Sequence, residues 1–324
     1  MATTRWGILG AGKICHDFVK SFSEYAANKQ NNKIVAVAAR DIERAREFAT
    51  KHKIDKVYGS YEDLAKDPEI DVIYMGNMHT HHLQEGKMCL DNGKHLLVEK
   101  PLTMNYKDSK ELIDYAKSKK LFLMEALWTR FFPAMAFIKD TISVGKIGEP
   151  MYLAASFALL VGSDRDIHDN VGYGAHYFLG VYPLQAALAI FDGKPEKVNT
   201  TAVKNKHGVV ITVTYTLTFK NGGVAQLMSS LGHNSTNRLL LEGTKGKIEI
   251  PQYMWTPTEV IVNGEKHEFP LPEFNQADYN YSRSVGLFQE VPPVAHCIRQ
   301  GLLECPQMPH EDTLTMAQIN DQVL

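Results

Sequence analysis

The first 125 residues alternate short apolar runs with longer segments of helical period, and this alternation restricts the fold more than any other feature. Apolar runs such as 34–38 and 72–75 are rich in β-branched residues and shorter than typical helices. The segments between them, such as 13–27 and 42–52, place apolar residues on one helical face. This order predicts βαβ units on a parallel sheet that helices cover on both faces, which is a doubly wound α/β domain.

The other elements of this N-terminal part follow the same pattern. Further strands are expected at 5–9, 95–98 and 121–124, and further helices at 61–65, 81–92 and 105–119. The helix at 42–52 is expected to begin at Asp41, a residue type that caps helix N-termini. Residues 1–125 are therefore expected to form a Rossmann-type domain.

After Pro150 the chain changes to longer runs in which apolar and polar residues alternate. Residues 209–219 and 224–229 are expected to be antiparallel strands, and Asn221-Gly222-Gly223 between them is a hairpin signal. Helices are expected at 175–191, 294–303 and 311–323. Residues 126–324 are therefore expected to form an α+β domain with a large, mainly antiparallel sheet.

Charge and composition argue against several classes of partner. The 324 residues include 35 Lys and Arg against 37 Asp and Glu, without a basic block, which argues against nucleic acid. No apolar run of about 18 residues and no leader-like N-terminus is visible, which argues against a membrane span and a secretion signal. The four cysteines lack paired metal-ligand spacing, which predicts free thiols and a cytoplasmic location.

A glycine turn joins the first strand to the first helix. Gly10 and Gly12 would let the backbone approach a pyrophosphate, and the helix that opens at Lys13 and Ile14 would supply N–H donors and a positive dipole. The third small residue of such a motif is Cys15 here. A glycine-rich turn without a ligand is the alternative, but the position between strand and helix favours dinucleotide binding.

The end of the second strand distinguishes the two nicotinamide cofactors. An acidic residue there would bind the ribose hydroxyl of NAD, whereas this chain has Arg40, which suits the 2′-phosphate of NADP. A solvated arginine is the other interpretation, and the adjacent Asp41 keeps NAD open. The favoured cofactor is NADP(H).

Charged and polar side chains follow the third and fourth expected strands. Glu99, Lys100 and Pro101 follow one of them, and Asn77 and His79 follow the other. Doubly wound sheets bind ligands at the carboxyl edge of their strands, so these residues are candidates for the site. With the glycine turn, the E-K-P sequence resembles the Gfo/Idh/MocA family of oxidoreductases.

One branch of that family is especially similar, over nearly the whole chain. The similar stretches are 35–41, 58–62, 121–126 and 128–133. That branch comprises NADP-linked dehydrogenases of cyclic trans-diols and of D-xylose. The resemblance implies hydride transfer to or from a carbinol carbon of a small sugar, polyol or diol, and a homodimer that pairs C-terminal sheets.

The resemblance also assigns roles to individual residues. Lys100 is expected beside the nicotinamide, and Tyr182 is expected to transfer the proton. Further cofactor contacts are expected from Asn77, His79, His82 and Glu99, and a substrate pocket from Trp128, Arg130, Phe178 and Tyr182. A tyrosine with an ordinary pKa of about 10 is a poor base at neutral pH, and a nearby ammonium would lower this pKa.

Two features of these candidates leave alternatives. A zinc site at His79, His81 and His82 is disfavoured, because adjacent side chains diverge and no distant ligand completes the set, so no metal is expected. Related enzymes carry an aspartate four residues before the tyrosine, where this chain has Phe178. An aromatic ring cannot replace that carboxylate, so an NADP(H)-binding protein without redox turnover and an enzyme for a different reaction stay open.

Overall fold

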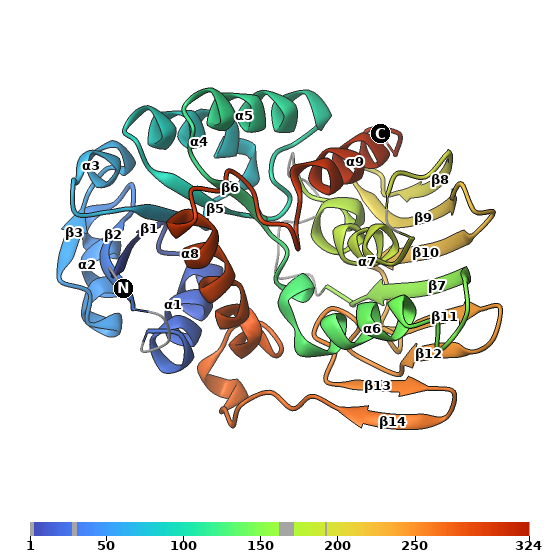
Figure 1. The fold of residues 1–324 in the computed structure, drawn as a ribbon. Coiled ribbons are helices and arrows are strands. Elements are labelled where there is room, and N and C mark those ends of the chain that lie inside the picture. Colours follow the sequence, from blue (N-terminus) through green and yellow to red (C-terminus); the bar gives the residue numbers. More distant parts are fainter. Residues whose placement is uncertain (1–2, 28–30, 162–171, 192, 324) are drawn as a thin grey trace. The chain divides into compact units, whose positions relative to one another are not determined.

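The protein, as a computed structural model, is described over residues 3–27, 31–161, 172–191 and 193–323 and separates into two compact units (Figure 1). The first unit comprises Met1–Trp128 and Leu271–Thr313, and the second comprises Thr129–Pro270 and Leu314–Leu324. The change of unit after Trp128 lies close to the boundary expected after residue 125. The segment Leu271–Thr313 differs from the expectation, because it packs with the N-terminal unit.

The first unit contains a parallel sheet of six strands in the order β3-β2-β1-β4-β5-β6. The strands are β1 (Thr4–Leu9), β2 (Asn32–Ala38), β3 (Lys56–Tyr58), β4 (Val72–Met75), β5 (His95–Glu99) and β6 (Leu123–Ala126). Every neighbouring pair is parallel. This strand order is that of dinucleotide-binding domains, and it confirms the expected doubly wound fold.

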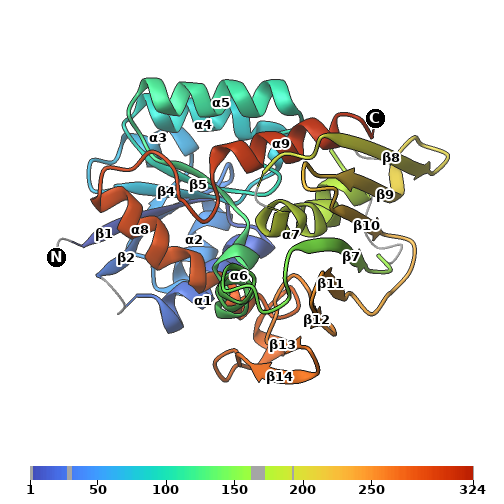
Figure 2. The same ribbon diagram turned by 45° about the vertical axis from the view of Figure 1, so that its right-hand side comes forward.

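Helices cover both faces of this sheet. They are α1 (Lys13–Tyr25), α2 (Ile42–His52), α3 (Tyr61–Lys66), α4 (His82–Asp91), α5 (Tyr106–Ser118) and α8 (Val291–Arg299). Figures 1 and 2 show α4 and α5 side by side over one face, with α1 and α8 on the other. The Asp41 carboxylate accepts a hydrogen bond from the Glu43 N–H at 2.9 Å, which confirms Asp41 as the cap of α2.

Two strands of this sheet differ from the sequence-based expectation. The short strand β3 has no counterpart among the expected elements, and β6 begins two residues later than expected. The shift of β6 follows from the way α5 ends. Lys120 adopts a φ of 58°, and the Leu121 N–H donates to the Ala116 carbonyl at 3.0 Å, so these residues close the helix instead of starting the strand.

A buried aspartate of α1 attaches the segment Leu271–Thr313 to the first unit. The Asp17 carboxylate accepts hydrogen bonds from the N–H groups of Asn280 and Tyr281, both at 2.9 Å, and from the Ser284 hydroxyl at 2.6 Å. One turn further along α1, the Ser21 hydroxyl accepts from the Phe288 N–H at 2.9 Å. These partners lie more than 260 positions from α1 in the chain, so no local pattern predicts their pairing.

The second unit is built on an eight-stranded sheet in the order β14-β13-β12-β11-β7-β10-β9-β8. The strands are β7 (Pro150–Ala158), β8 (Lys197–Lys204), β9 (Val210–Thr218), β10 (Val224–Ser230), β11 (Leu239–Gly243), β12 (Lys247–Ile250), β13 (Glu259–Val262) and β14 (Glu265–Glu268). Only β7 and β10 pair in parallel among these neighbours. The expected large, mainly antiparallel sheet is confirmed, as is the hairpin, in which the Gly223 N–H donates to the Asn221 side chain at 2.9 Å.

The helices of the second unit are α6 (Pro133–Ser143), α7 (Val181–Phe191) and the larger part of α9 (His310–Asn320). The expected single helix at 175–191 is divided, because residues His176–Gly180 form a π-helical turn before α7. Gly180 accommodates a close neighbour in this turn, since a Cβ there would lie 2.6 Å from the Tyr215 hydroxyl. No helix in the described ranges is long and apolar enough to cross a membrane.

The central strands of this sheet have one covered and one uncovered face. The face that includes Leu153 of β7, Leu227 of β10 and Leu217 of β9 is fully buried, and α7 packs on β7 and β10. On the opposite face, Thr214 and Gln226 are exposed. Successive side chains of a strand point to opposite faces, so the alternation predicted from the sequence corresponds to this difference in burial.

Candidate active site

The glycine turn between β1 and α1 has the backbone that a pyrophosphate site requires. Gly10 adopts a φ of 115°, a conformation that disfavours side chains, and its N–H donates to the Ala38 carbonyl at 2.9 Å. Gly12 precedes α1 with extended backbone, and no side chain caps the helix. A Cβ built on Gly12 would meet nothing within 4 Å, and Lys13 and Ile14 form the first turn. The open helix N-terminus fits a bound phosphate group.

Cys15 takes the place of the third glycine without blocking the turn. Its Sγ lies 3.4 Å from the Gly76 carbonyl oxygen, and a Cβ on Gly76 would lie only 2.5 Å from the same sulfur. Because Gly76 has no side chain, the Cys15 side chain fits at the position where the dinucleotide-binding motif has its third glycine. Burial raises the pKa of the Cys15 thiol to about 12, so it is a neutral packing group.

Arg40 is exposed just beyond the end of β2. It makes no hydrogen bond or ion pair to any residue that the structure describes. Burial raises the pKa of Tyr61 in α3 and of Glu85 in α4, and the positive charge of Arg40 opposes both shifts. One oxygen of the exposed Asp41 carboxylate caps α2, whereas the Arg40 guanidinium has no such engagement with the described residues and is available to a ligand.

The polar residues after β4 form a connected group. The Asn77 amide donates to the Glu85 carboxylate. His82 is fully buried, and its ring nitrogens lie 3.0 Å from the Leu102 carbonyl oxygen and 3.3 Å from that of Asn77. Burial, together with the nearby His79, lowers the pKa of His82 to about 4, so its ring is neutral and connects the segments that follow β4 and β5. Over the described ranges, no three His, Cys, Asp or Glu side chains form a group that could hold a metal ion.

Glu99 and Lys100 lie at the carboxyl end of β5, and Glu99 is buried. The Glu99 carboxylate accepts hydrogen bonds from the Tyr74 hydroxyl at 2.7 Å and from the Lys100 backbone N–H at 3.2 Å. Burial raises the pKa of Glu99, and the charge of Lys100 opposes this shift. Burial lowers the pKa of Lys100, and Glu99 and Glu125 oppose it. A lysine with a lowered pKa can exchange a proton closer to neutral pH.

In the second unit, Tyr182 lies in the first turn of α7 within an aromatic cluster. Its ring meets that of Phe157 edge-on at 5.3 Å, and Phe157 stacks on Trp255 at 4.2 Å. Phe178, in the π-helical turn, is half-buried and stacks on Tyr173 at 5.0 Å. Aromatic faces of this kind suit the apolar face of a sugar or a carbocyclic ring.

Arg130 is a buried residue with structural partners. It follows Trp128 in a 3-10 turn, η2 (Trp128–Phe131), and both side chains are buried. Its guanidinium donates to the side chain of Gln185 at 2.6 Å and to the Gln185 carbonyl at 2.8 Å. The guanidinium therefore holds this turn against α7, which sequence reasoning did not anticipate.

The expected site residues divide between the two units. The first unit contains Gly10, Gly12, Lys13, Ile14, Arg40, Asn77, His79, His82, Glu99, Lys100 and Trp128, and the second contains Arg130, Phe178 and Tyr182. Apart from Trp128, the residues of the first unit lie at or just after the carboxyl ends of β1, β2, β4 and β5, and Glu99 is the last residue of β5. Tyr74 was missed, because its hydroxyl reaches Glu99 from a neighbouring strand and not from a sequence motif.

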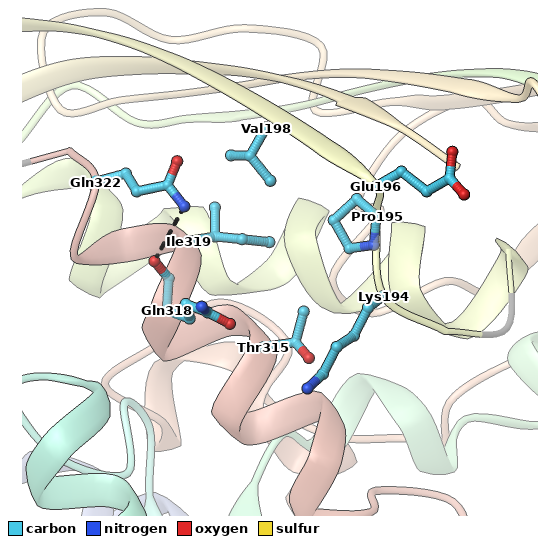
Figure 3. A pocket seen from close by; sticks show the side chains of 8 residues that line it. All are labelled: Lys194, Pro195, Glu196, Val198, Thr315, Gln318, Ile319 and Gln322. Carbon is cyan, nitrogen blue, oxygen red and sulfur yellow. Dashed lines mark hydrogen bonds between the residues drawn. The ribbon is translucent and has the colours of Figure 1, made fainter. Parts of the chain in front are cut away.

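A separate pocket of about 240 Å³ lies within the second unit (Figure 3). Pro195, just before β8, and Val198, in β8, line one side of it, and Thr315 and Ile319 of α9 line the other. None of the expected site residues lines this pocket.

The parallel sheet, the open glycine turn and a lysine with a lowered pKa at the same sheet edge fit the class of dinucleotide-dependent oxidoreductases. Residues 4–127 match the family model described as "Oxidoreductase family, NAD-binding Rossmann fold", and residues 135–249 match the GFO/IDH/MocA C-terminal domain. The chain belongs to the Gfo/Idh/MocA oxidoreductase family, which confirms the resemblance carried by the glycine turn and the E-K-P sequence.

Similar proteins cover almost the full length. A trans-1,2-dihydrobenzene-1,2-diol dehydrogenase of Xenopus laevis is 41% identical over 323 residues, 99% of this chain and 97% of its own. The protein of the same name from Danio rerio is 40% identical over 320 residues, 98% of this chain and 95% of its own. A 3-ketoreductase from Actinomadura kijaniata, solved with TDP-benzene and NADP, has a TM-score of 0.81 at 24% identity, over 99% of this chain and 97% of its own, which shows the shared fold.

Proposed function

We propose that this chain is an NADP(H)-dependent dehydrogenase that acts on the carbinol carbon of a small sugar, polyol or cyclic trans-diol. The observation that carries the proposal is Lys100, whose pKa is lowered by burial at the sheet edge that also presents the glycine turn. The full-length relatives named as diol dehydrogenases support the substrate class. They also favour an active enzyme over an NADP(H)-binding protein without turnover.

The residues of the first unit would hold the cofactor, and bound NADP(H) would accept or donate the hydride. Gly10, Gly12 and the first turn of α1, with Lys13 and Ile14, would bind the pyrophosphate. Arg40 would pair with the 2′-phosphate. Nicotinamide contacts would come from the residues after β4 and β5, namely Asn77, His79, His82, Glu99 and Lys100.

Lys100 and Tyr182 would carry out the proton transfer. In oxidation, the Tyr182 phenolate would accept the proton of the carbinol hydroxyl, and in reduction the Tyr182 hydroxyl would return it. The Lys100 ammonium stabilises the phenolate form that oxidation requires. Trp128, Arg130 and Phe178 shape the substrate pocket together with Tyr182, and Phe178 supplies an aromatic wall where related enzymes carry an acid.

A binding measurement followed by a turnover measurement tests this function. We expect NADPH fluorescence to report binding to the purified protein. We then expect a trans-dihydrodiol or D-xylose to reduce NADP at an ordinary enzyme rate of about 1–100 per second, followed by absorbance. Binding without turnover of any diol, sugar or carbonyl compound would contradict the proposal and favour a binding protein.

We also propose that the chain is a cytoplasmic homodimer that pairs through the second sheet. The uncovered face of the central strands supports this arrangement, because its side chains Thr214 and Gln226 are exposed in the described unit. Sedimentation at micromolar concentration should give twice the chain mass of 36.4 kDa. Met228 lies on the same face, and Met228→Glu should shift the protein to the monomer. A wild-type monomer would refute the pairing.

A further inference from the structure

The cavity beside α9 has no role in the function proposed above. It has a volume of about 240 Å³, and its lining residues, from the start of β8 and from α9 and the residues just after it, all belong to the second unit (Figure 3). Cavities for drug-sized ligands are larger, about 300–1,000 Å³, so this one would select a compact molecule. Its lining combines apolar side chains with charged and amide groups, which can bury a ligand and also orient it.

The wall that α9 supplies follows from helical spacing. Thr315, Gln318 and Ile319 are separated by three and four positions along α9, so their side chains share one face of the helix, and all three line the cavity. Ile319 is buried, whereas Gln318 is exposed. The face therefore offers an apolar surface with polar groups beside it.

Hydrogen bonds within the second unit hold this wall against the sheet. The Thr200 hydroxyl of β8 donates to the carbonyl of Gln322, just after α9, at 3.0 Å. The Tyr215 hydroxyl of β9 donates to the side chain of Asn320, the last residue of α9, at 2.9 Å. Neither bond needs a ligand, so the cavity is preformed, as small-molecule sites usually are.

The Thr315 hydroxyl is the observation that points to a ligand. Thr315 is only 4% exposed, and its hydroxyl has no hydrogen-bond partner among the described residues. Most buried hydroxyl groups are paired, because an unpaired one destabilises the fold. Figure 3 shows the Lys194 side chain extending from the segment before β8 toward Thr315. An ammonium group and a hydroxyl group thus face the same part of the cavity.

These groups suit a carboxylate. The ammonium of Lys194 can only donate hydrogen bonds, and the hydroxyl of Thr315 can donate one, so both match an anionic acceptor. The carboxylate of Glu196, which also lines the cavity, points away from Thr315 in Figure 3. Thr315 lies more than one turn before the end of α9, outside the last turn, where the helix dipole opposes an anion. A single lysine matches the single charge of a carboxylate better than the nearly double charge of a phosphate group.

We propose that this cavity is a second ligand site, which binds a small aliphatic carboxylate. Lys194 and Thr315 bind the carboxylate group, and the apolar side chains of the lining enclose the aliphatic chain. Those apolar side chains are Pro195, Val198 and Ile319. The ligand supplies the partner that the buried hydroxyl lacks within the described chain.

Titration of the full chain with butyrate tests the class of ligand. We expect saturation-transfer NMR to give a dissociation constant of about 1–10 mM for butyrate, which is the range of a small ligand with one charged group. Acetate has two methylene groups fewer and should bind about tenfold more weakly. Butyramide has a similar shape without the charge and should bind at least about tenfold more weakly. Equal affinity for butyrate and butyramide, tighter binding of inorganic phosphate, or a butyrate dissociation constant above about 50 mM would overturn the proposal.

Substitutions in the cavity locate the bound carboxylate. Thr315→Val keeps the shape of the side chain but removes the hydroxyl, and Lys194→Met removes the ammonium; each should weaken butyrate binding by about tenfold. Because the hydroxyl has no partner in the described chain, Thr315→Val should melt at the wild-type temperature or up to about 2 °C above it. A lower melting temperature with unchanged butyrate affinity would show that Thr315 only packs and would refute its role in binding.

Two lysine variants are the controls. Lys204→Met changes an exposed lysine at the far end of β8 and should leave butyrate binding unchanged. Lys100→Met should also leave it unchanged, because Lys100 does not line this cavity. Loss of butyrate binding in Lys100→Met, but not in Lys194→Met, would place the carboxylate at the candidate active site and contradict a second site. The titration involves no turnover, so it stands or falls independently of the proposed dehydrogenase activity.

Discussion

Lys100→Met should lower kcat by about a thousandfold or more, while the dissociation constant for NADPH stays within about threefold of wild type. The substitution removes the ammonium but retains most of the side-chain volume. Without that charge, the tyrosine that exchanges the substrate proton loses the group that stabilises its phenolate. The expected loss corresponds to about 4 kcal/mol of transition-state stabilisation. Steady-state turnover of a diol or D-xylose and fluorescence titration with NADPH measure the two quantities.

Two further variants separate a chemical effect from a structural one. Tyr182→Phe removes only a hydroxyl from the aromatic cluster and should reduce kcat by at least about a hundredfold. Lys117→Met changes an exposed lysine of α5 and should leave both measured quantities unchanged. If Lys100→Met turns over like wild type, the lysine has no part in the proton transfer.

Arg40→Ala should weaken NADPH binding by about 30- to 100-fold and leave NADH binding almost unchanged. A charge-assisted hydrogen bond to the 2′-phosphate contributes about 2–3 kcal/mol, and NADH has no phosphate at that position. The exposed guanidinium has no partner in the described part of the chain, so its removal should not disturb the fold. Fluorescence titrations with the two cofactors give the ratio directly.

Arg46→Ala provides the control for charge at the same helix. The Arg46 guanidinium pairs with Glu43 at 2.6 Å on the surface of α2, and its loss should change neither affinity by more than about twofold. Equal weakening of NADPH and NADH by Arg40→Ala would show that the arginine does not recognise the 2′-phosphate. In that case the neighbouring Asp41 would have to be reconsidered as a ribose ligand.

Much of the local structure could be predicted from short stretches of sequence. The alternation of strands and helices, the Asp41 cap and the Asn221 hairpin all depend on residues within a few positions of one another. The same holds for the glycine turn, where the positive φ of Gly10 and the open helix start at Gly12 follow from the residues present. Such features are local in sequence, so a single chain is enough to recognise them.

The candidate site was predictable only in part. The glycine turn and Lys100 stand out from their position at the carboxyl ends of strands, and Tyr182 stood out only through resemblance to a family. The π-helical turn that carries Phe178 was not expected, because its sequence is compatible with an ordinary helix. The wider π-helical turn accompanies close packing of Gly180 against Tyr215 of β9, a strand that is distant in the sequence.

By itself, the amino-acid sequence determined the two types of sheet, the order of most elements and the residue types offered at the sheet edge. Only the tertiary structure decided that Leu271–Thr313 belongs to the first unit, through the hydrogen bonds of buried Asp17. Only the tertiary structure brought the Tyr74 hydroxyl to the Glu99 carboxylate. The physical reason is that periodicity and capping act between near neighbours, whereas burial and electrostatic coupling depend on residues that approach one another only when the chain has folded.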